Sequence, residues 1–149
     1  MNKLLGTVLT SALTISLLAG CGTSTSSKKK VGIIQFMDHT SLNEIKDSFD
    51  KEMKTLGYDD KNIEYTFKNG QGDRNTCASI ANDFAGKNFD CVMAIATPAA
   101  QAVAKLATKT PVVFSAVTDL VGSQLTSSLT KPDKNITGTS DEVQVDQII

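Results

Sequence analysis

The stretch Asp90-Cys-Val-Met-Ala-Ile-Ala-Thr-Pro-Ala-Ala-Gln-Ala-Val-Ala104 decides the fold of this chain. It opens with a short apolar run, Val92 to Ile95, which is typical of a parallel strand buried on both faces. Thr97 then has the side chain of a helix N-cap, and Pro98 suits the first helical position, where its missing N–H costs nothing. The stretch therefore predicts a strand that runs directly into a helix.

The first turn of this helix is a candidate binding site. Ala99 and Ala100 should carry backbone N–H groups without a partner inside the helix, and their side chains are too small to block an approaching ligand. With the Thr97 hydroxyl beside them, these groups would attract a carboxylate or another small anion. The alternative is an ordinary connection between a strand and a helix that binds nothing.

The rest of the chain repeats the same unit. Strands are predicted at 31–36, 63–67 and 111–117, with helices between them. Ser41 and Glu44 form a capping box at the start of the first helix, and Asp73 caps the second. The predicted inward faces of the two helices are Leu42, Ile45, Phe49, Met53 and Leu56 in the first, and Cys77, Ile80, Ala81 and Phe84 in the second. The fold class is therefore α/β, an open parallel sheet with helices on both faces, as in a Rossmann-like lobe.

The region after the fourth strand is less regular. Leu125 and Leu129 suggest a short helical turn, residues 135–138 an extended piece, and Val143 the start of another helix. We see no internal repeat of sequence.

Polar residues gather where the predicted strands end. The carboxyl ends of parallel strands share one edge of the sheet, and ligands of open α/β sheets bind there. The polar residues expected at this edge are Gln35, His39, Gln71, Asp73, Thr97, Ser115, Thr118 and Asp119.

Several of these candidates have an ordinary alternative. Asp119 and Asp141 could accept hydrogen bonds from an ammonium group, or could simply cap turns. His39 could flank a ligand or be solvated in its loop. Phe36 could line an apolar pocket or belong to the core.

The N-terminus has the features of a bacterial secretion signal. Lys3 precedes a moderately apolar stretch, residues 4–18, which is too short and too polar to span a membrane. Leu18-Ala-Gly-Cys21 resembles the lipobox of bacterial lipoproteins, in which the chain is cleaved before the cysteine and the thiol takes a diacylglycerol. We therefore expect a signal peptide over 1–20, a lipidated Cys21 followed by a flexible tether to residue 30, and a lipid-anchored protein on the extracytoplasmic face of the cell membrane. The alternative is an ordinary signal peptide or a chance cysteine.

Composition excludes several classes of function. The chain has a formal net charge of −1, no Trp and no basic patch, so nucleic acid is not an expected partner. A single His and two separated Cys make no metal site. Cys77 and Cys91 should lie at opposite ends of a helix, roughly 14 Å apart, which is too far for a disulfide. The chain lacks a nucleophile elbow, a dinucleotide fingerprint and a Walker lysine, so neither an enzyme nor a cofactor is expected.

The motifs taken together resemble a known family. The sequences that carry the resemblance are Val31-Gly-Ile-Ile-Gln-Phe36, Gln71-Gly-Asp73, Ala94-Ile-Ala-Thr-Pro-Ala-Ala-Gln101, Phe114-Ser-Ala-Val-Thr-Asp119 and Lys131-Pro-Asp-Lys-Asn-Ile-Thr-Gly138. They resemble the ABC-transporter substrate-binding proteins, in the branch that includes tryptophan and aromatic amino-acid binding lipoproteins (TrpX-like). The resemblance extends from Val31 to Asp141.

The resemblance implies a fold and a function. Such proteins have two periplasmic-binding-protein-like lobes joined by a hinge, are not enzymes, and deliver a small solute to a membrane permease. The chain would be a truncated one, in which 31–140 form the N-terminal lobe, 141–149 begin the crossover and the second lobe is missing. The ligand-binding residues implied are Phe36, His39, Thr97, Ala99, Ala100, Thr118, Asp119, Ser140 and Asp141.

Two other functions remain open at this stage. The same fold could serve as the ligand-sensing ectodomain of a signalling system. A small lipid-anchored enzyme is the second alternative, since Asp73, Asp119 and Asp141 could converge as catalytic carboxylates.

Overall fold

Five parallel strands form one sheet in the order β2-β1-β3-β4-β5. The structure is a computed structural model, and it describes residues 27–131 and 134–141. The elements are β1 (Lys29–Gln35), α1 (Thr40–Thr55), β2 (Ile63–Asn69), α2 (Arg74–Ala85), β3 (Cys91–Ile95), α3 (Thr97–Val103), the 3₁₀ helix η1 (Ala104–Thr108), β4 (Val112–Val117) and β5 (Ile136–Ser140). The predicted α/β class is confirmed, and the extended piece expected at 135–138 is a fifth strand of the sheet.

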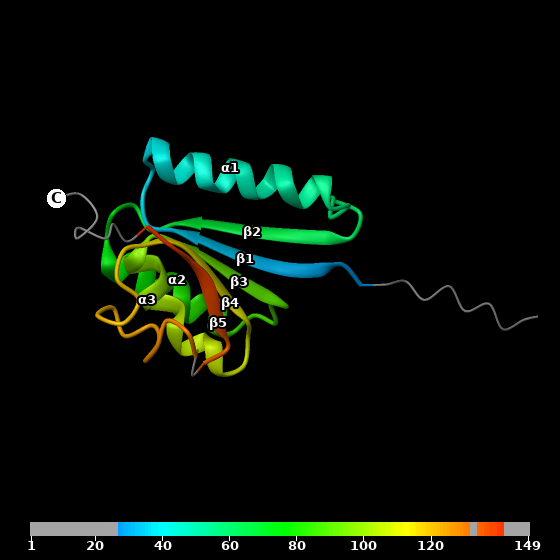
Figure 1. Ribbon diagram of the computed structural model, residues 1–149. Coiled ribbons are helices and arrows are strands. Elements are labelled where there is room, and N and C mark those ends of the chain that lie inside the picture. The colour runs from blue at the N-terminus through cyan, green and yellow to red at the C-terminus, as the bar shows by residue number, and fades with distance from the viewer. Residues whose placement is uncertain (1–26, 132–133, 142–149) are drawn as a thin grey trace, which may run out of the picture.

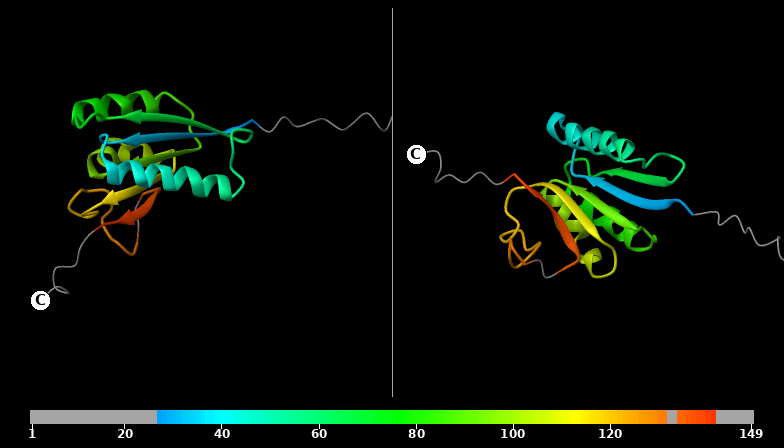
Figure 2. Two further views of the ribbon diagram at one scale, coloured as in Figure 1. Left: turned by 90° about the horizontal axis from the view of Figure 1, so that it is seen from above. Right: turned by 45° about the vertical axis from the view of Figure 1, so that its right-hand side comes forward.

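Helices cover both faces of the sheet, as the alternation of strands and helices predicts. In Figure 1, α1 lies along one face, and α2 and α3 lie on the other. Figure 2 shows the same layers from above. Ile33 and Met93 pack toward α1, whereas Ile34 and Ala94 belong to the core on the side of α2 and α3. Successive side chains of a strand point to opposite faces, so a continuous apolar run fills both layers.

Nearly all of the residues predicted to face inward on the two helices pack against the sheet. Cys77, Ala81 and Phe84 of α2 are buried, with Ile80 packed against the same core. In α1, the predicted inner residues pack against the sheet except Leu56, which forms the C-cap and is 62% exposed. Leu56 lies outside the helix because the chain turns away at Gly57, whose positive φ of 86° is easily adopted by glycine.

The start of α1 differs from the prediction. The helix begins at Thr40, and His39 is its N-cap, with Nδ1 accepting a hydrogen bond of 3.3 Å from the backbone N–H of Ser41. Ser41 therefore lies inside the first turn, and the expected capping box of Ser41 and Glu44 is wrong. An imidazole nitrogen of His39 takes the place that a hydroxyl was expected to fill.

Two loop predictions also need correction. Lys29 and Lys30 belong to β1 rather than to a flexible tether, because their backbones pair with the start of β2. The helical turn expected from Leu125 to Leu129 does not form: the hydrogen-bonded turn lies over 120–124, Leu125 is buried and Leu129 is 63% exposed. The signal peptide, Cys21 and the helix expected near Val143 lie outside the described residues.

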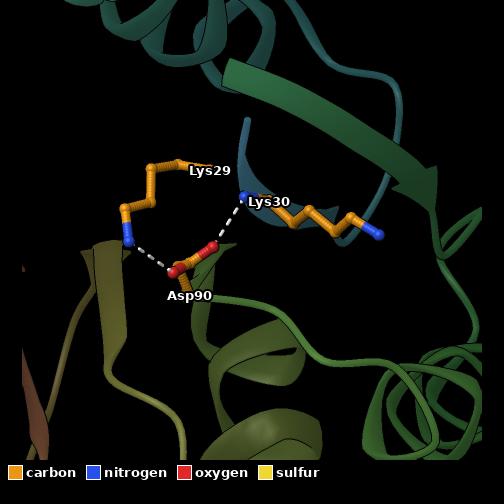
Figure 3. Close-up of polar contacts among 3 residues, drawn as sticks. All are labelled: Lys29, Lys30 and Asp90. Carbon is orange, nitrogen blue, oxygen red and sulfur yellow. Dashed lines mark hydrogen bonds and ion pairs between the residues drawn. The ribbon is translucent and has the colours of Figure 1, made fainter. Parts of the chain in front are cut away.

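Asp90, just before β3, links the first residues of β1 to the start of β3. Its carboxylate accepts from the Nζ of Lys29 at 3.0 Å and from the backbone N–H of Lys30 at 2.8 Å (Figure 3). The Lys30 N–H is the larger cause, and with the Lys29 ammonium it holds the pKa of Asp90 below its ordinary value of 3.8.

The two contacts of Asp90 predict a pH dependence. A carboxyl with a lowered folded-state pKa stabilises the fold above its unfolded pKa, and this stabilisation is lost as the pH falls through the folded-state pKa. We expect Asp90→Asn to lower the melting temperature at pH 7, with the difference from wild type disappearing below pH 3.8. Thermal melts across this range measure the effect, and a difference independent of pH would contradict it.

Both remaining cysteines in the described residues are free thiols. Cys77 is buried and Cys91 is half-buried. Desolvation is the main cause that raises the pKa of each thiol above its ordinary value, so both are neutral at physiological pH.

Candidate functional site

The carboxyl ends of β1, β3 and β4 and the loop after β2 are joined into one edge by backbone hydrogen bonds. Gly72 donates to the carbonyl of Phe36 at 2.9 Å, Phe36 donates to Ile95 at 3.1 Å, and Ala96 donates to Ser115 at 2.9 Å. The connections that follow the strands therefore start side by side. This edge faces left in Figure 1, opposite the end at which β1 enters the sheet.

A cluster of predicted residues joins β3, β4 and β5 at this edge. The Thr97 hydroxyl, half-buried at the end of β3, accepts a hydrogen bond of 3.5 Å from the backbone N–H of Thr118. Ser140 donates from its hydroxyl to the carbonyl of Val117 at 2.8 Å, and the backbone N–H of Asp141 donates to the same carbonyl at 3.2 Å. Residues from a stretch of 45 positions are thus neighbours: Thr97, Thr118, Ser140 and Asp141.

The start of α3 is not the bare helix end that the sequence predicts. Ala96, with φ of 79°, is the N-cap, and Thr97 is the first helical residue, so the prediction of Thr97 as the cap is wrong. Ala100 donates its backbone N–H to Ala96 at 3.1 Å, which contradicts the expectation that this amide is free. Within the described residues the Ala99 amide has no hydrogen-bond partner, although Ala99 and Ala100 are both fully buried. With Ala96 as the N-cap, the Thr97 hydroxyl does not cap the helix and instead accepts from the backbone N–H of Thr118.

Asp119 caps its own turn, which is the ordinary alternative expected for it. It lies at the edge and is exposed, and one carboxylate oxygen caps its own turn by accepting from the backbone N–H of Gly122 at 2.7 Å. The second oxygen makes no hydrogen bond within the described residues. A turn aspartate can therefore still present an acceptor to an ammonium group.

His39 and Phe36 lie just beyond the end of β1. His39 is exposed, and because its Nδ1 accepts a hydrogen bond, the neutral ring carries its proton on Nε2 and can donate outward. Phe36 is half-buried against the core on the side of α2 and α3, so the core alternative holds for at least part of its ring.

The sequence reasoning missed a buried polar chain behind His39. Gln35 is only 1% exposed, and its Nε2 donates to Asn43 at 2.7 Å and to the carbonyl of Met37 at 2.8 Å. Asn43 in turn donates to Asp38 at 2.7 Å. These hydrogen bonds hold the loop after β1 against the first turn of α1. In the sequence, the only sign of this network was a glutamine at the end of an apolar strand.

A second missed residue is Gln101, on the helix that opens at the edge. Its Oε1 accepts from Arg74 at 2.9 Å, and its Nε2 donates to the carbonyl of Ser123 at 3.3 Å. Gln101 thereby joins the start of α2 to the loop after β4.

Asp73 and Asp119 do not follow neighbouring strands. Asp73 caps α2, where the backbone N–H of Thr76 is the main cause that lowers its pKa. It follows β2, and β1 and β3 lie between β2 and the strand that precedes Asp119. At about 4.8 Å per strand, three strand steps separate β2 from β4 by roughly 14 Å.

Neither a candidate metal cluster nor a membrane-spanning helix is found in the described part of the chain. Among residues 27–131 and 134–141, no group of three His, Cys, Asp or Glu side chains could hold a metal ion. No helix within these ranges combines the length and the apolar character that crossing a membrane requires.

The protein family that the sequence matches agrees with the fold and with the polar edge described above. Residues 30–149 match the family described as ABC transporter substrate binding protein. This chain belongs to that family. The parallel sheet, with polar residues at its carboxyl edge, agrees with this membership.

One relative of this chain is named for its ligand. The chain is 35% identical to a tyrosine-binding protein of Clostridioides difficile strain R20291 over 162 residues, which cover 99% of this chain and 47% of the relative. It therefore spans about half the length of that relative.

Solved structures show the same lobe. A domain from Streptococcus pneumonia in complex with L-Trp is 36% identical, with a TM-score of 0.74, covering 78% of this chain and 39% of that one. A ligand-free, open substrate binding protein with adhesive properties from Clostridium difficile is 40% identical, with a TM-score of 0.76, covering 80% and 41%. The fold of this chain is thus that of part of each larger protein.

Proposed function

We propose that this chain is the ligand-binding lobe of an extracytoplasmic solute-binding lipoprotein that captures an aromatic amino acid for an ABC importer. The cluster of Thr97, Thr118 and Ser140 at the sheet edge carries the proposal. The tyrosine-binding relative and the neighbour in complex with L-Trp support the ligand class.

The edge offers a partner for each part of an amino acid. The hydroxyls of Thr97 and Thr118 would donate to the ligand carboxylate, with the Ala99 amide behind them. The open oxygens of Asp119 and Asp141 would accept from the ammonium group. Phe36 and the Nε2 of His39 would lie beside the ligand side chain. Each role is a binding role, and the proposal includes no catalytic step.

The proposal also places the protein at the membrane. The Leu18-Ala-Gly-Cys21 sequence supports a thioether-linked lipid on Cys21, and the family supports a permease as the partner that receives the solute. We expect wild-type chain produced in a bacterium to incorporate labelled palmitate and Cys21→Ala to incorporate none. Labelling of the Ala variant would contradict the proposed anchor.

Replacing the Thr97 hydroxyl tests the proposed ligand site. We expect Thr97→Val to weaken binding of L-Tyr and L-Trp about tenfold, the loss of one hydrogen bond to a charged group. Isothermal titration calorimetry on the whole chain measures the change. Val keeps the shape of the side chain, so circular dichroism should be unchanged.

A threonine at the opposite edge supplies the control. Thr110 is also half-buried, precedes β4 and lies away from the cluster, so Thr110→Val should leave the affinity unchanged. An unchanged affinity in Thr97→Val would remove Thr97 from the site. If neither amino acid binds the wild-type chain, the proposed function fails for this chain.

A further inference from the structure

The amino edge of the sheet, opposite the ligand edge, carries a group of lysines that the proposed solute site does not use. A hollow of about 260 Å³ between the ends of α2 and η1 is lined by Lys87, Lys105 and Lys109. Lys87 also lines two further hollows. Lys109 lines one of them, and Lys30 lines the other. We call the surface formed by Lys28, Lys29, Lys30, Lys87, Lys105 and Lys109 the lysine edge.

Acidic side chains neutralise only part of the lysine edge. Asp83 pairs with Lys87 at 2.9 Å, and Asp90 is occupied by Lys29 and by the backbone N–H of Lys30. In Figure 3 the Lys30 ammonium points away from Asp90.

Three of the four lysines that line the hollows are left without a carboxylate partner. Within the described residues, Lys30, Lys105 and Lys109 form no ion pair, and Lys105 donates only to the neutral amide of Asn82, at 2.6 Å. Glu64 is the other acid that lines these hollows. The edge therefore keeps an excess of positive charge.

The ligand edge has the opposite sign. The residues that directly follow the strands include Asp38, Asp73, Asp119 and Asp141, against Arg74 as the cation. Because all strands are parallel, the two sets of charges lie at opposite ends of the sheet. An anionic surface would therefore attract the lysine edge and repel the ligand edge.

The point at which the chain enters the sheet indicates which anionic surface lies near the lysine edge. Lys28 to Lys30 lead into β1 at the lysine edge. Lys29 lies eight positions after Cys21, a span of at most about 28 Å. A lipid on Cys21 would thus hold this edge within reach of the bilayer, a step that rests on the proposed function.

We propose that the lysine edge docks on anionic phospholipid headgroups and turns the ligand edge toward solution. The ammonium groups of Lys30, Lys105 and Lys109 donate to headgroup phosphates, and the hollows between them admit those groups. Such contacts weaken with salt, since exposed charges are screened beyond about 8 Å at physiological ionic strength.

Amine footprinting on vesicles tests the docking. The whole chain is mixed with vesicles of phosphatidylcholine and phosphatidylglycerol, or of phosphatidylcholine alone, and treated briefly with an acetylating reagent. On anionic vesicles at low salt, we expect Lys30, Lys105 and Lys109 to be acetylated roughly threefold more slowly, and the protection to be lost at high salt. Lys51 and Lys68, on α1 and β2, are internal controls that should react equally throughout.

Matched variants complete the test. Replacing Lys30, Lys105 and Lys109 by Gln should reduce binding to anionic vesicles about tenfold relative to a control with the same charge change at Lys46, Lys51 and Lys68. Equal binding of the two variants, equal protection on neutral vesicles, or protection by inorganic phosphate alone would each overturn the proposal. Binding of L-Tyr and palmitate labelling are measured separately, so a failed footprint leaves the proposed function standing.

Discussion

Phe84→Ala should destabilise the fold by about 3–5 kcal/mol, the range for removing a fully buried aromatic ring. Phe84 is 2% exposed and packs edge-on to Phe89, with ring centroids 4.9 Å apart. It also fills the space above Gly32, where an added Cβ would lie 2.9 Å from the ring. The ring therefore fills a site in the core layer between α2 and β1, and alanine would leave a cavity there.

Urea unfolding followed by far-UV circular dichroism measures this loss, if the transition is two-state. Phe67 is the matched control, since its ring is 41% exposed on β2 under the ammonium of Lys46. Phe67→Ala should cost less than about 1 kcal/mol. A similar loss in both variants would contradict the central position that the structure assigns to Phe84.

Gly70→Ala is expected to cost about 2–3 kcal/mol, because there is no room for a side chain where β2 ends. An added Cβ would overlap the Sγ of Cys77 and lie 2.8 Å from the carbonyl oxygen of Phe36. Gly70 also donates its backbone N–H to Gln35 at 2.8 Å, so the loop cannot move away without losing that bond. The same substitution should disturb the ligand edge, because Phe36 is one of the proposed site residues.

A double-mutant cycle isolates the contact with the sulfur. Cys77→Ala removes Sγ, so Gly70→Ala should cost at least about 1 kcal/mol less in the Cys77→Ala background than in the wild type. Gly86→Ala is the control, because the nearest atom to its added Cβ is 3.6 Å away, and its effect should stay within about 0.5 kcal/mol. Strict additivity of the two substitutions would show that Cys77 is not the obstacle.

Local patterns predicted the elements and the edge at which they end. The apolar run at Val92 to Ile95 and the spacing of Leu42, Ile45 and Phe49 depend on the geometry of one strand or one helix, which neighbouring residues determine by themselves. Since short connections between such elements enforce a parallel sheet, the placement of His39, Thr97 and Asp119 after strands already placed them on one edge.

Helix starts were harder to predict, because they depend on single torsion angles. The sequence offers Ser41 and Thr97 as caps, yet His39 and Ala96 fill these positions. Several residues in each loop can end an extended segment, and the packing of the following helix selects among them. Consequently the sequence marked Ala100 as a free amide, and the structure uses that amide within the helix.

The sequence by itself determined the alternation of strands and helices, the two-layer burial and the polar edge, because these follow from periodicities of two and 3.6 residues. Only the tertiary structure decided the order β2-β1-β3-β4-β5, the contact of Thr97 with Thr118, and the burial of Gln35 against Asn43. It also separated Asp73 from Asp119 and gathered the lysines of distant segments at the opposite edge. These are contacts between residues far apart in the chain, and they exist only once the whole sheet has assembled and set each strand beside its neighbours.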